Sequence, residues 1–154
     1  MRRLKLMTAL VTAALTMGLG AAYGADSHTI TVSAAVAGNC KFQGASTSTI
    51  SLTIDAAATT TINQIGNVTY RCTNGTAPAF VMASGSTASG TGGNLIQGAE
   101  SIPYTYSSTN TGAGTGMGGG NDKTLAVTVS VNQANAASVT PGTYTDTIAV
   151  TLTP

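Results

Sequence analysis

The sequence is poor in the residues that build large cores and catalytic sites. Its 154 residues contain no tryptophan, two phenylalanines and one histidine, and only 7% of them are charged. A Ser-His-Asp triad needs its histidine within hydrogen-bond distance of both partners. His28 lies just behind an apolar leader, where nothing nearby in the sequence could hold it, and the five acidic residues form no close pair. We therefore expect a protein that is not an enzyme.

Metal and cofactor motifs are also missing. No second histidine accompanies His28, no CxxC occurs, and no Asp-x-Asp-x-Asp pattern supports a calcium site. The glycine-rich stretch 116–120 lacks the Lys-Ser/Thr ending of a phosphate-binding loop, so a flexible loop is the better interpretation. We expect no metal site and no cofactor.

The first 24 residues have the pattern of a signal peptide. Arg2, Arg3 and Lys5 precede an uncharged run over residues 6–19, and Ala22-Tyr23-Gly24 fits the small-x-small rule for cleavage. The run is shorter than the roughly 20 residues that span a bilayer, and no second apolar segment follows. We expect cleavage before Ala25, export, and no membrane insertion of the mature chain.

Removal of the leader leaves few charges on the mature chain. Three basic residues, Lys41, Arg71 and Lys123, remain beside the five acidic ones, Asp26, Asp55, Glu100, Asp122 and Asp146. No basic stripe is left to follow a phosphate backbone, which argues against nucleic-acid binding. The remaining 130 residues fit a single domain, whose small side chains would bury little area each.

The two cysteines, Cys40 and Cys72, both belong to the exported part of the chain. Export places them where oxidation is permitted, and the alternatives of a redox pair or metal ligands lack the necessary neighbours. The sequence therefore predicts a structural disulfide, which would stabilise the fold by roughly 3–4 kcal/mol through the loop that it closes.

Apolar residues alternate with serine and threonine along most of the mature chain. Such period-two patterns predict half-buried strands. They occupy residues 30–36, 50–54, 68–72, 80–82, 95–96, 102–106, 125–131 and 144–152. The linkers 84–93 and 107–121 are rich in glycine, serine and threonine and are expected to be long surface loops. Seven or eight strands with no helix between them indicate an all-β sandwich or barrel.

Several of these features resemble a known family. Cys40 near the domain start, the Tyr104-Thr105-Tyr106 strand before a glycine-rich loop, and the ending from Gly142 through Tyr144 to Leu152 are similar to the spore coat protein U domain. This domain is the pilin module of archaic chaperone-usher pili. The resemblance implies an immunoglobulin-like β-sandwich that lacks its final strand and is completed by donor-strand exchange.

The resemblance also implies roles for individual segments. Residues 25–37 would be an N-terminal donor strand, with Ile30, Val32, Ala34 and Val36 as its inserting side chains, and residues 38–154 would be the pilin domain. The residues expected to line the acceptor groove are Leu125, Val127, Val129, Val131, Ile148, Val150 and Leu152. Strand addition of this kind supplies main-chain hydrogen bonds and fills pockets with alternate side chains.

The function implied is that of a structural subunit of a surface pilus, polymerising head to tail and supporting adhesion and biofilm formation. Its partners would be further copies of itself and related pilins, a periplasmic chaperone and an outer-membrane usher, and it would pass through the periplasm to the cell surface. Two alternatives stay open: a monomeric secreted carbohydrate-binding sandwich, and a coat protein of a spore or cell made by the same route.

Overall fold

The computed structural model describes residues 26–86 and 91–154. The expected signal peptide, residues 1–24, and its cleavage site before Ala25 lie outside the described residues. Contacts divide the chain into two units, residues 1–35 and residues 36–154, and each is treated by itself.

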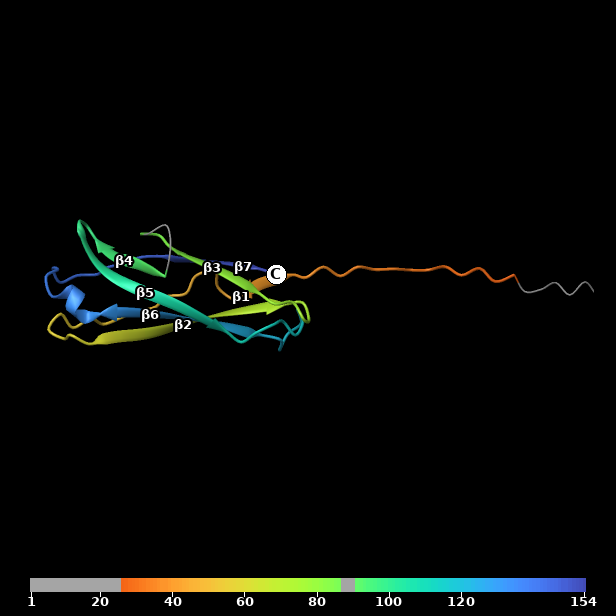
Figure 1. The fold of residues 1–154 in the computed structure, drawn as a ribbon, viewed down its shortest axis with the longest axis horizontal. Helices are drawn as coiled ribbons and strands as arrows, with labels where there is room; N and C mark the ends of the chain where they lie inside the picture. The colour runs from red at the N-terminus through yellow and green to blue at the C-terminus, as the bar shows by residue number, and fades with distance from the viewer. Residues whose placement is uncertain (1–25, 87–90) are drawn as a thin grey trace, which may run out of the picture. The chain divides into compact units, whose positions relative to one another are not determined.

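The regular secondary structure of the second unit is almost entirely antiparallel β-strand (Figure 1). These are β1 (Cys40–Gln43), β2 (Thr61–Cys72), β3 (Ala79–Ser84), β4 (Gly92–Gln97), β5 (Glu100–Asn110), β6 (Lys123–Asn132) and β7 (Ile148–Thr153), with the 3-10 helix η1 (Gln133–Ala136) after β6. Five strands form one sheet in the order β1-β2-β6-β5-β4, and β3 pairs with β7 in a second. The all-β fold predicted from the sequence is confirmed, and the arrangement fits an immunoglobulin-like sandwich.

The central strand β6 illustrates why these segments form sheets. Its apolar residues Leu125, Val127, Val129 and Val131 are all buried, while the residues between them are only half-buried. β5 matches it, because Ile102, Tyr104 and Tyr106 point to the same side, with Tyr106 opposite Val129 in the register. Alternation of this kind fixes the register, since a slip by one residue would expose the whole apolar face.

Aromatic contacts join the two sheets. The ring of Tyr70 from β2 meets the ring of Phe80 from β3 edge to face, with their centroids 5.1 Å apart. Val150 and Leu152 of β7 pack against the same cluster, which centres on Tyr70 and Leu125. A second cluster, around Tyr104 and Tyr106, fills the other half of the sandwich.

The predicted disulfide is present and joins β1 to β2. Cys40 and Cys72 are direct cross-strand partners in the register, their Cα atoms are 4.1 Å apart, and Cys72 is fully buried. β1 has only four residues. The bond therefore fixes a short edge strand that has few hydrogen bonds of its own.

Several expected elements differ from the structure. Residues 50–54 are assigned to no strand, although Ile50, Leu52 and Ile54 still alternate inward. The last strand begins at Ile148 and not at residue 144. Asp146, which precedes it, accepts hydrogen bonds from the hydroxyl groups of Ser84 and Tyr104. The expected loop 107–121 is shorter, since β5 continues to Asn110.

The first unit is described only over residues 26–35, and these are assigned to no strand and no helix. The alternation at residues 30–36 therefore forms no sheet within the described chain. Over residues 26–86 and 91–154, no helix is long and apolar enough to cross a membrane.

Candidate functional site

Within residues 26–86 and 91–154, strand β7 has a neighbouring strand on one side only. It pairs with β3 from Ser84 opposite Ile148 to Ala79 opposite Thr153. Before β7, the single bridge between Thr145 and Ile96 ties the chain to β4. An edge strand presents a row of backbone donors and acceptors to any strand that can add to it.

The second feature of the site is the segment of residues 49–54. Ile50, Leu52 and Ile54 are half-buried and pack against the core, whereas Ser51 and Thr53 are exposed. No backbone hydrogen bond joins residues 49–54 to another described residue. The segment thus has the side-chain pattern of a strand without a strand partner.

A cavity of about 630 Å³ lies between this segment and residues 139–145, which lead into β7. Its apolar lining includes Ile50, Leu52, Ile54, Leu95, Ile102, Ala136, Val139 and Tyr144. The cavity is open to solvent on one side, so part of this apolar lining is not covered by another element. The cavity opens the core of the second unit at the start of β7.

Glu100 holds the chain at the mouth of this cavity. Its Oε2 accepts hydrogen bonds from the backbone N and the Oγ1 of Thr140, at 2.9 and 2.6 Å, and from the Tyr144 hydroxyl at 2.5 Å. These hydrogen bonds lower the pKa of the Glu100 carboxyl group. The carboxylate therefore fixes the loop that forms one side of the opening.

Asp146 holds the start of β7 against the rest of the sandwich. Its Oδ2 accepts hydrogen bonds from Ser84 Oγ, Ser86 Oγ and the Tyr104 hydroxyl, at 2.5, 2.7 and 2.8 Å. Burial raises the pKa of Asp146, but these hydrogen bonds lower it by more. Burial and the neighbouring Asp146 raise the pKa of Tyr104 to about 12. The network fixes the strand that forms the free edge.

The predicted groove residues fall into two groups in the structure. Leu125, Val127, Val129 and Val131 of β6 are buried within the core. Ile148, Val150 and Leu152 are half-buried on the inner face of β7, next to the free edge. The predicted set does not include Ile50, Leu52 and Ile54, which line the cavity and whose alternation predicts a half-buried strand.

The predicted donor residues are strongly exposed. Ile30 is 77% exposed, Val32 88% and Val36 87%, and Ala34 is exposed as well. Large apolar side chains at regular spacing with this much exposure are a feature of interaction segments. An extended segment of this kind is suited to strand addition.

In the part of the chain that the structure describes, no group of three or more His, Cys, Asp or Glu side chains could hold a metal ion. The two polar clusters, at Glu100 and at Asp146, are occupied by hydroxyl and backbone donors. Both position the chain around the cavity.

Comparison with known proteins gives one match. No curated protein and no solved structure matches the chain. A family model described as the Spore Coat Protein U domain matches residues 26–151, which include most of the leading segment, the disulfide and the first four residues of β7. Since the match spans most of the sequence, the chain belongs to the Spore Coat Protein U domain family.

Proposed function

We propose that this protein is a structural subunit of a chaperone-usher surface pilus and polymerises head to tail by donor-strand exchange. Two observations carry the proposal: the edge of β7 that faces no described strand, and the cavity of about 630 Å³ between residues 49–54 and residues 139–145, which lead into β7. In this proposal the acceptor gap runs along that edge from the cavity. An added strand would gain backbone hydrogen bonds from β7 and would place alternate side chains in the gap.

The occupant of the gap is the leading segment of a second copy. Ile30, Val32, Ala34 and Val36 alternate with polar or small residues, so that one face of an extended strand carries all four. Their exposure in the single chain means that insertion would remove apolar area from water, at about 1.5–3 kcal/mol for each large side chain. Donor and acceptor surfaces differ, so the contact does not close and yields a fibre.

The groove in this proposal has a floor and two walls. The floor is Leu125, Val127, Val129 and Val131 of β6, and one wall is Ile148, Val150 and Leu152 of β7. The structure adds the second wall, Ile50, Leu52 and Ile54, as a candidate.

Family membership supports the wider assembly. Spore Coat Protein U domains are structural pilin or coat modules, which in general have a chaperone and an usher as partners. We infer that this chain crosses the periplasm bound to such a chaperone, is added to the fibre at an outer-membrane usher, and supports adhesion and biofilm formation at the cell surface.

The test compares two arginine substitutions at neighbouring positions of the donor segment. Val32→Arg places a charge on the inserting face, whereas Ser33→Arg places the same charge on the opposite face. We expect the purified mature wild-type chain and Ser33→Arg to form ladders that resist mild denaturant, and Val32→Arg to stay monomeric. Ladders of normal length from Val32→Arg would overturn the donor assignment.

Two further variants extend the test. Ile30→Arg is expected to behave like Val32→Arg, and deletion of residues 25–37 is expected to leave subunits that bind the chaperone without polymerising. Both expectations follow from the exposure of the donor segment. They also follow from the proposed groove, whose residues all lie within 38–154 and remain after the deletion.

A further inference from the structure

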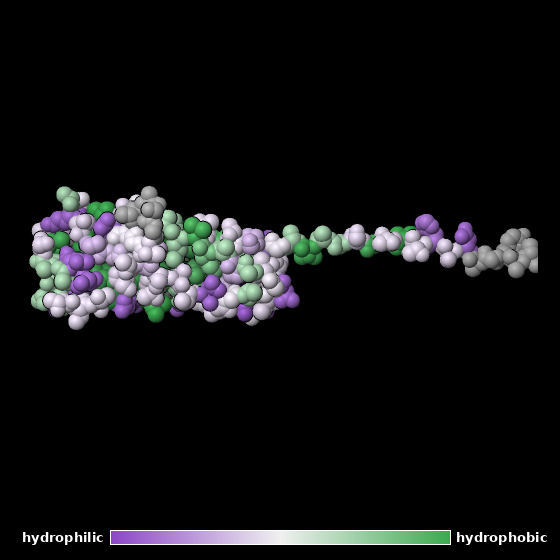
Figure 2. Space-filling view, in the orientation of Figure 1, coloured by the Kyte–Doolittle hydropathy of each residue, from purple (hydrophilic) through white to green (hydrophobic). Residues whose placement is uncertain are grey.

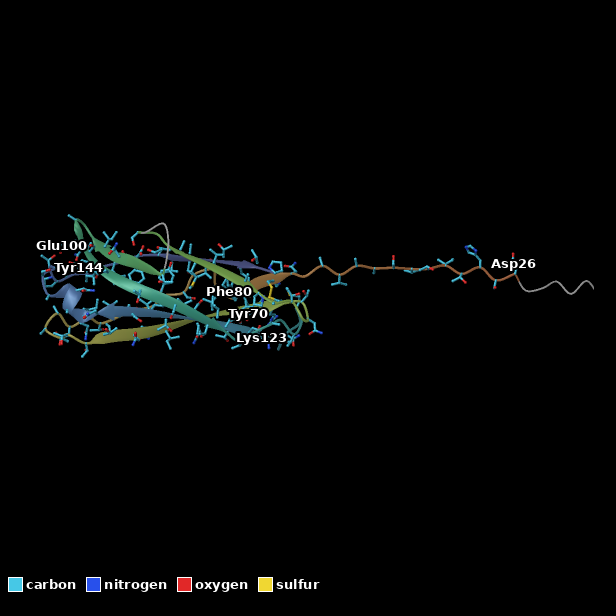
Figure 3. All side chains as sticks on the ribbon, viewed as in Figure 1. Asp26, Tyr70, Phe80, Glu100, Lys123 and Tyr144 are labelled. Carbon is cyan, nitrogen blue, oxygen red and sulfur yellow. A yellow bond between two sulfur atoms is a disulfide. The ribbon has the colours of Figure 1, made fainter. Side chains whose placement is uncertain are left out.

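The charged side chains of the second unit are segregated to its two ends. Figure 3 labels Glu100 at one end and Lys123 at the other, and Figure 2 shows strongly hydrophilic residues mainly toward the two ends, with pale residues between them. The ten residues of β6 separate the ends, since Lys123 begins this strand and Gln133 follows it. At about 3.3 Å for each residue the separation is roughly 30 Å, which exceeds the Debye length of about 8 Å in physiological salt.

One end is basic. Lys41 of β1 lies directly opposite Arg71 of β2, and Lys123 opposes Tyr70 in the next row. Asp122 forms an ion pair with Arg71 and offsets one of the three positive charges. This basic end contains every lysine and arginine of the second unit.

The other end is acidic. Glu100 lies where β4 turns into β5, and Asp55 donates its backbone N–H to the Gln133 side chain at 2.8 Å, just beyond the end of β6. Asp146 follows Thr145, which bridges to Ile96, and lies two residues after Tyr144, whose hydroxyl group donates to Glu100. No basic residue of the described sequence occurs at this acidic end.

The leading segment joins the domain at the basic end. Asn39 exchanges hydrogen bonds with Thr73 there, through its N–H to Thr73 Oγ1 and through its carbonyl to the Thr73 N–H. Only three residues, 37–39, separate the last donor side chain, Val36, from Cys40. Four extended steps span at most about 14 Å, so an inserted donor holds its own basic end close to the neighbour.

We infer that the basic end of one subunit docks against the acidic end of the next copy of this chain. The inference rests on the proposed strand exchange. A donor that runs antiparallel to β7 leaves the groove at the start of β7, beside Glu100 and Asp146 of the acceptor. A parallel donor would leave it near Pro154, which lies against Gly38, and would bring two basic ends together. Opposite charges at such a contact speed the encounter and fix its direction.

The test uses charge reversals in the full mature chain. Lys41→Glu and Asp55→Lys are each expected to slow ladder growth about threefold at low salt, and the double variant is expected to recover the wild-type rate, because every copy then presents both exchanged charges. Thr105→Glu, an exposed position in the middle of β5, is the control and should leave the rate unchanged.

A second measurement needs no variant. Growth of the wild-type ladder should slow several-fold as salt is raised from 0.05 to 0.5 M, whereas capture of a synthetic peptide of residues 26–37, which carries no basic end, should change little. If the rate of ladder growth changes neither with salt nor with either charge reversal, the proposed contact between the basic and acidic ends is wrong. Strand exchange would be unaffected by that result. Absence of ladders from the wild-type chain would overturn the proposed function, and the inference with it.

Discussion

The hydroxyl group of Tyr104 donates a hydrogen bond of 2.8 Å to the carboxylate of Asp146. Tyr104 comes from the middle of β5, and Asp146 precedes β7, so the bond joins the two sheets at the point where the free edge begins. Ser84, which is 94% buried, shares the same oxygen. One carboxylate thus links the start of the edge strand to both sheets.

Replacement of Asp146 by alanine should therefore destabilise the domain. The hydroxyl groups of Ser84 and Tyr104 would lose their acceptor inside the sandwich, at a cost of about 1–3 kcal/mol in the free energy of unfolding. Urea denaturation of disulfide-intact chains that also carry Val32→Arg, which is expected to keep them monomeric, measures this change. Asp122→Ala serves as the control, because it breaks only the exposed ion pair with Arg71 and should lower the free energy of unfolding much less.

Low pH should weaken the hydrogen bonds by which Glu100 holds Thr140 and Tyr144 at one side of the cavity. Its pKa is lowered in the folded chain, so its contribution to stability is present above the ordinary value of 4.5 and is lost as the pH falls through the folded value. Glu100→Gln should be less stable than the wild type at neutral pH, and the two should converge in acid. Stability curves that stay parallel from pH 7 to pH 2.5 would contradict this role.

Removal of the disulfide should cost roughly 3–4 kcal/mol, because the bond closes a loop of 32 residues and secures the short strand β1. The measurement is denaturant unfolding of the Cys40→Ala/Cys72→Ala double variant beside the oxidised wild type. A loss below about 1 kcal/mol would show that β1 holds its place without the bond.

Gly114 is expected to tolerate no side chain. A Cβ atom there would come within 2.4–2.6 Å of the backbone of Cys72, which the sheet and the disulfide hold in place. Gly114→Ala should therefore cost about 1–3 kcal/mol. Gly119→Ala is the matched control, since its Cβ would meet no atom within 4 Å. Equal stability of the two variants in thermal unfolding would contradict the close approach.

The strands could be predicted from the sequence where one face is buried. The alternation over residues 125–131 gave β6, and the two cysteines of an exported chain gave the disulfide, because both depend on local chemistry. The alternation at residues 50–54 predicted a strand that the single chain does not form. Period-two burial shows that a face points inward, but a strand also needs a hydrogen-bond partner.

The polar contacts around the site could not be predicted. Glu100 and Tyr144 are 44 residues apart, and Ser84 and Asp146 are 62 apart. Only the sheet order brings them together, and no local pattern marks either pair. Ile50, Leu52 and Ile54 were missed as groove residues for the same reason, since the cavity that they line also depends on residues 139–145.

The structure of the assembled fibre, determined by electron cryomicroscopy, would decide whether donor-strand exchange takes place. We predict that residues 30–36 of one copy form a strand beside β7 of the next, with Ile30, Val32, Ala34 and Val36 facing the core between β7 and residues 49–54. A fibre in which residues 30–36 pack within their own domain, or in which the free edge of β7 has no strand from a neighbour, would contradict it.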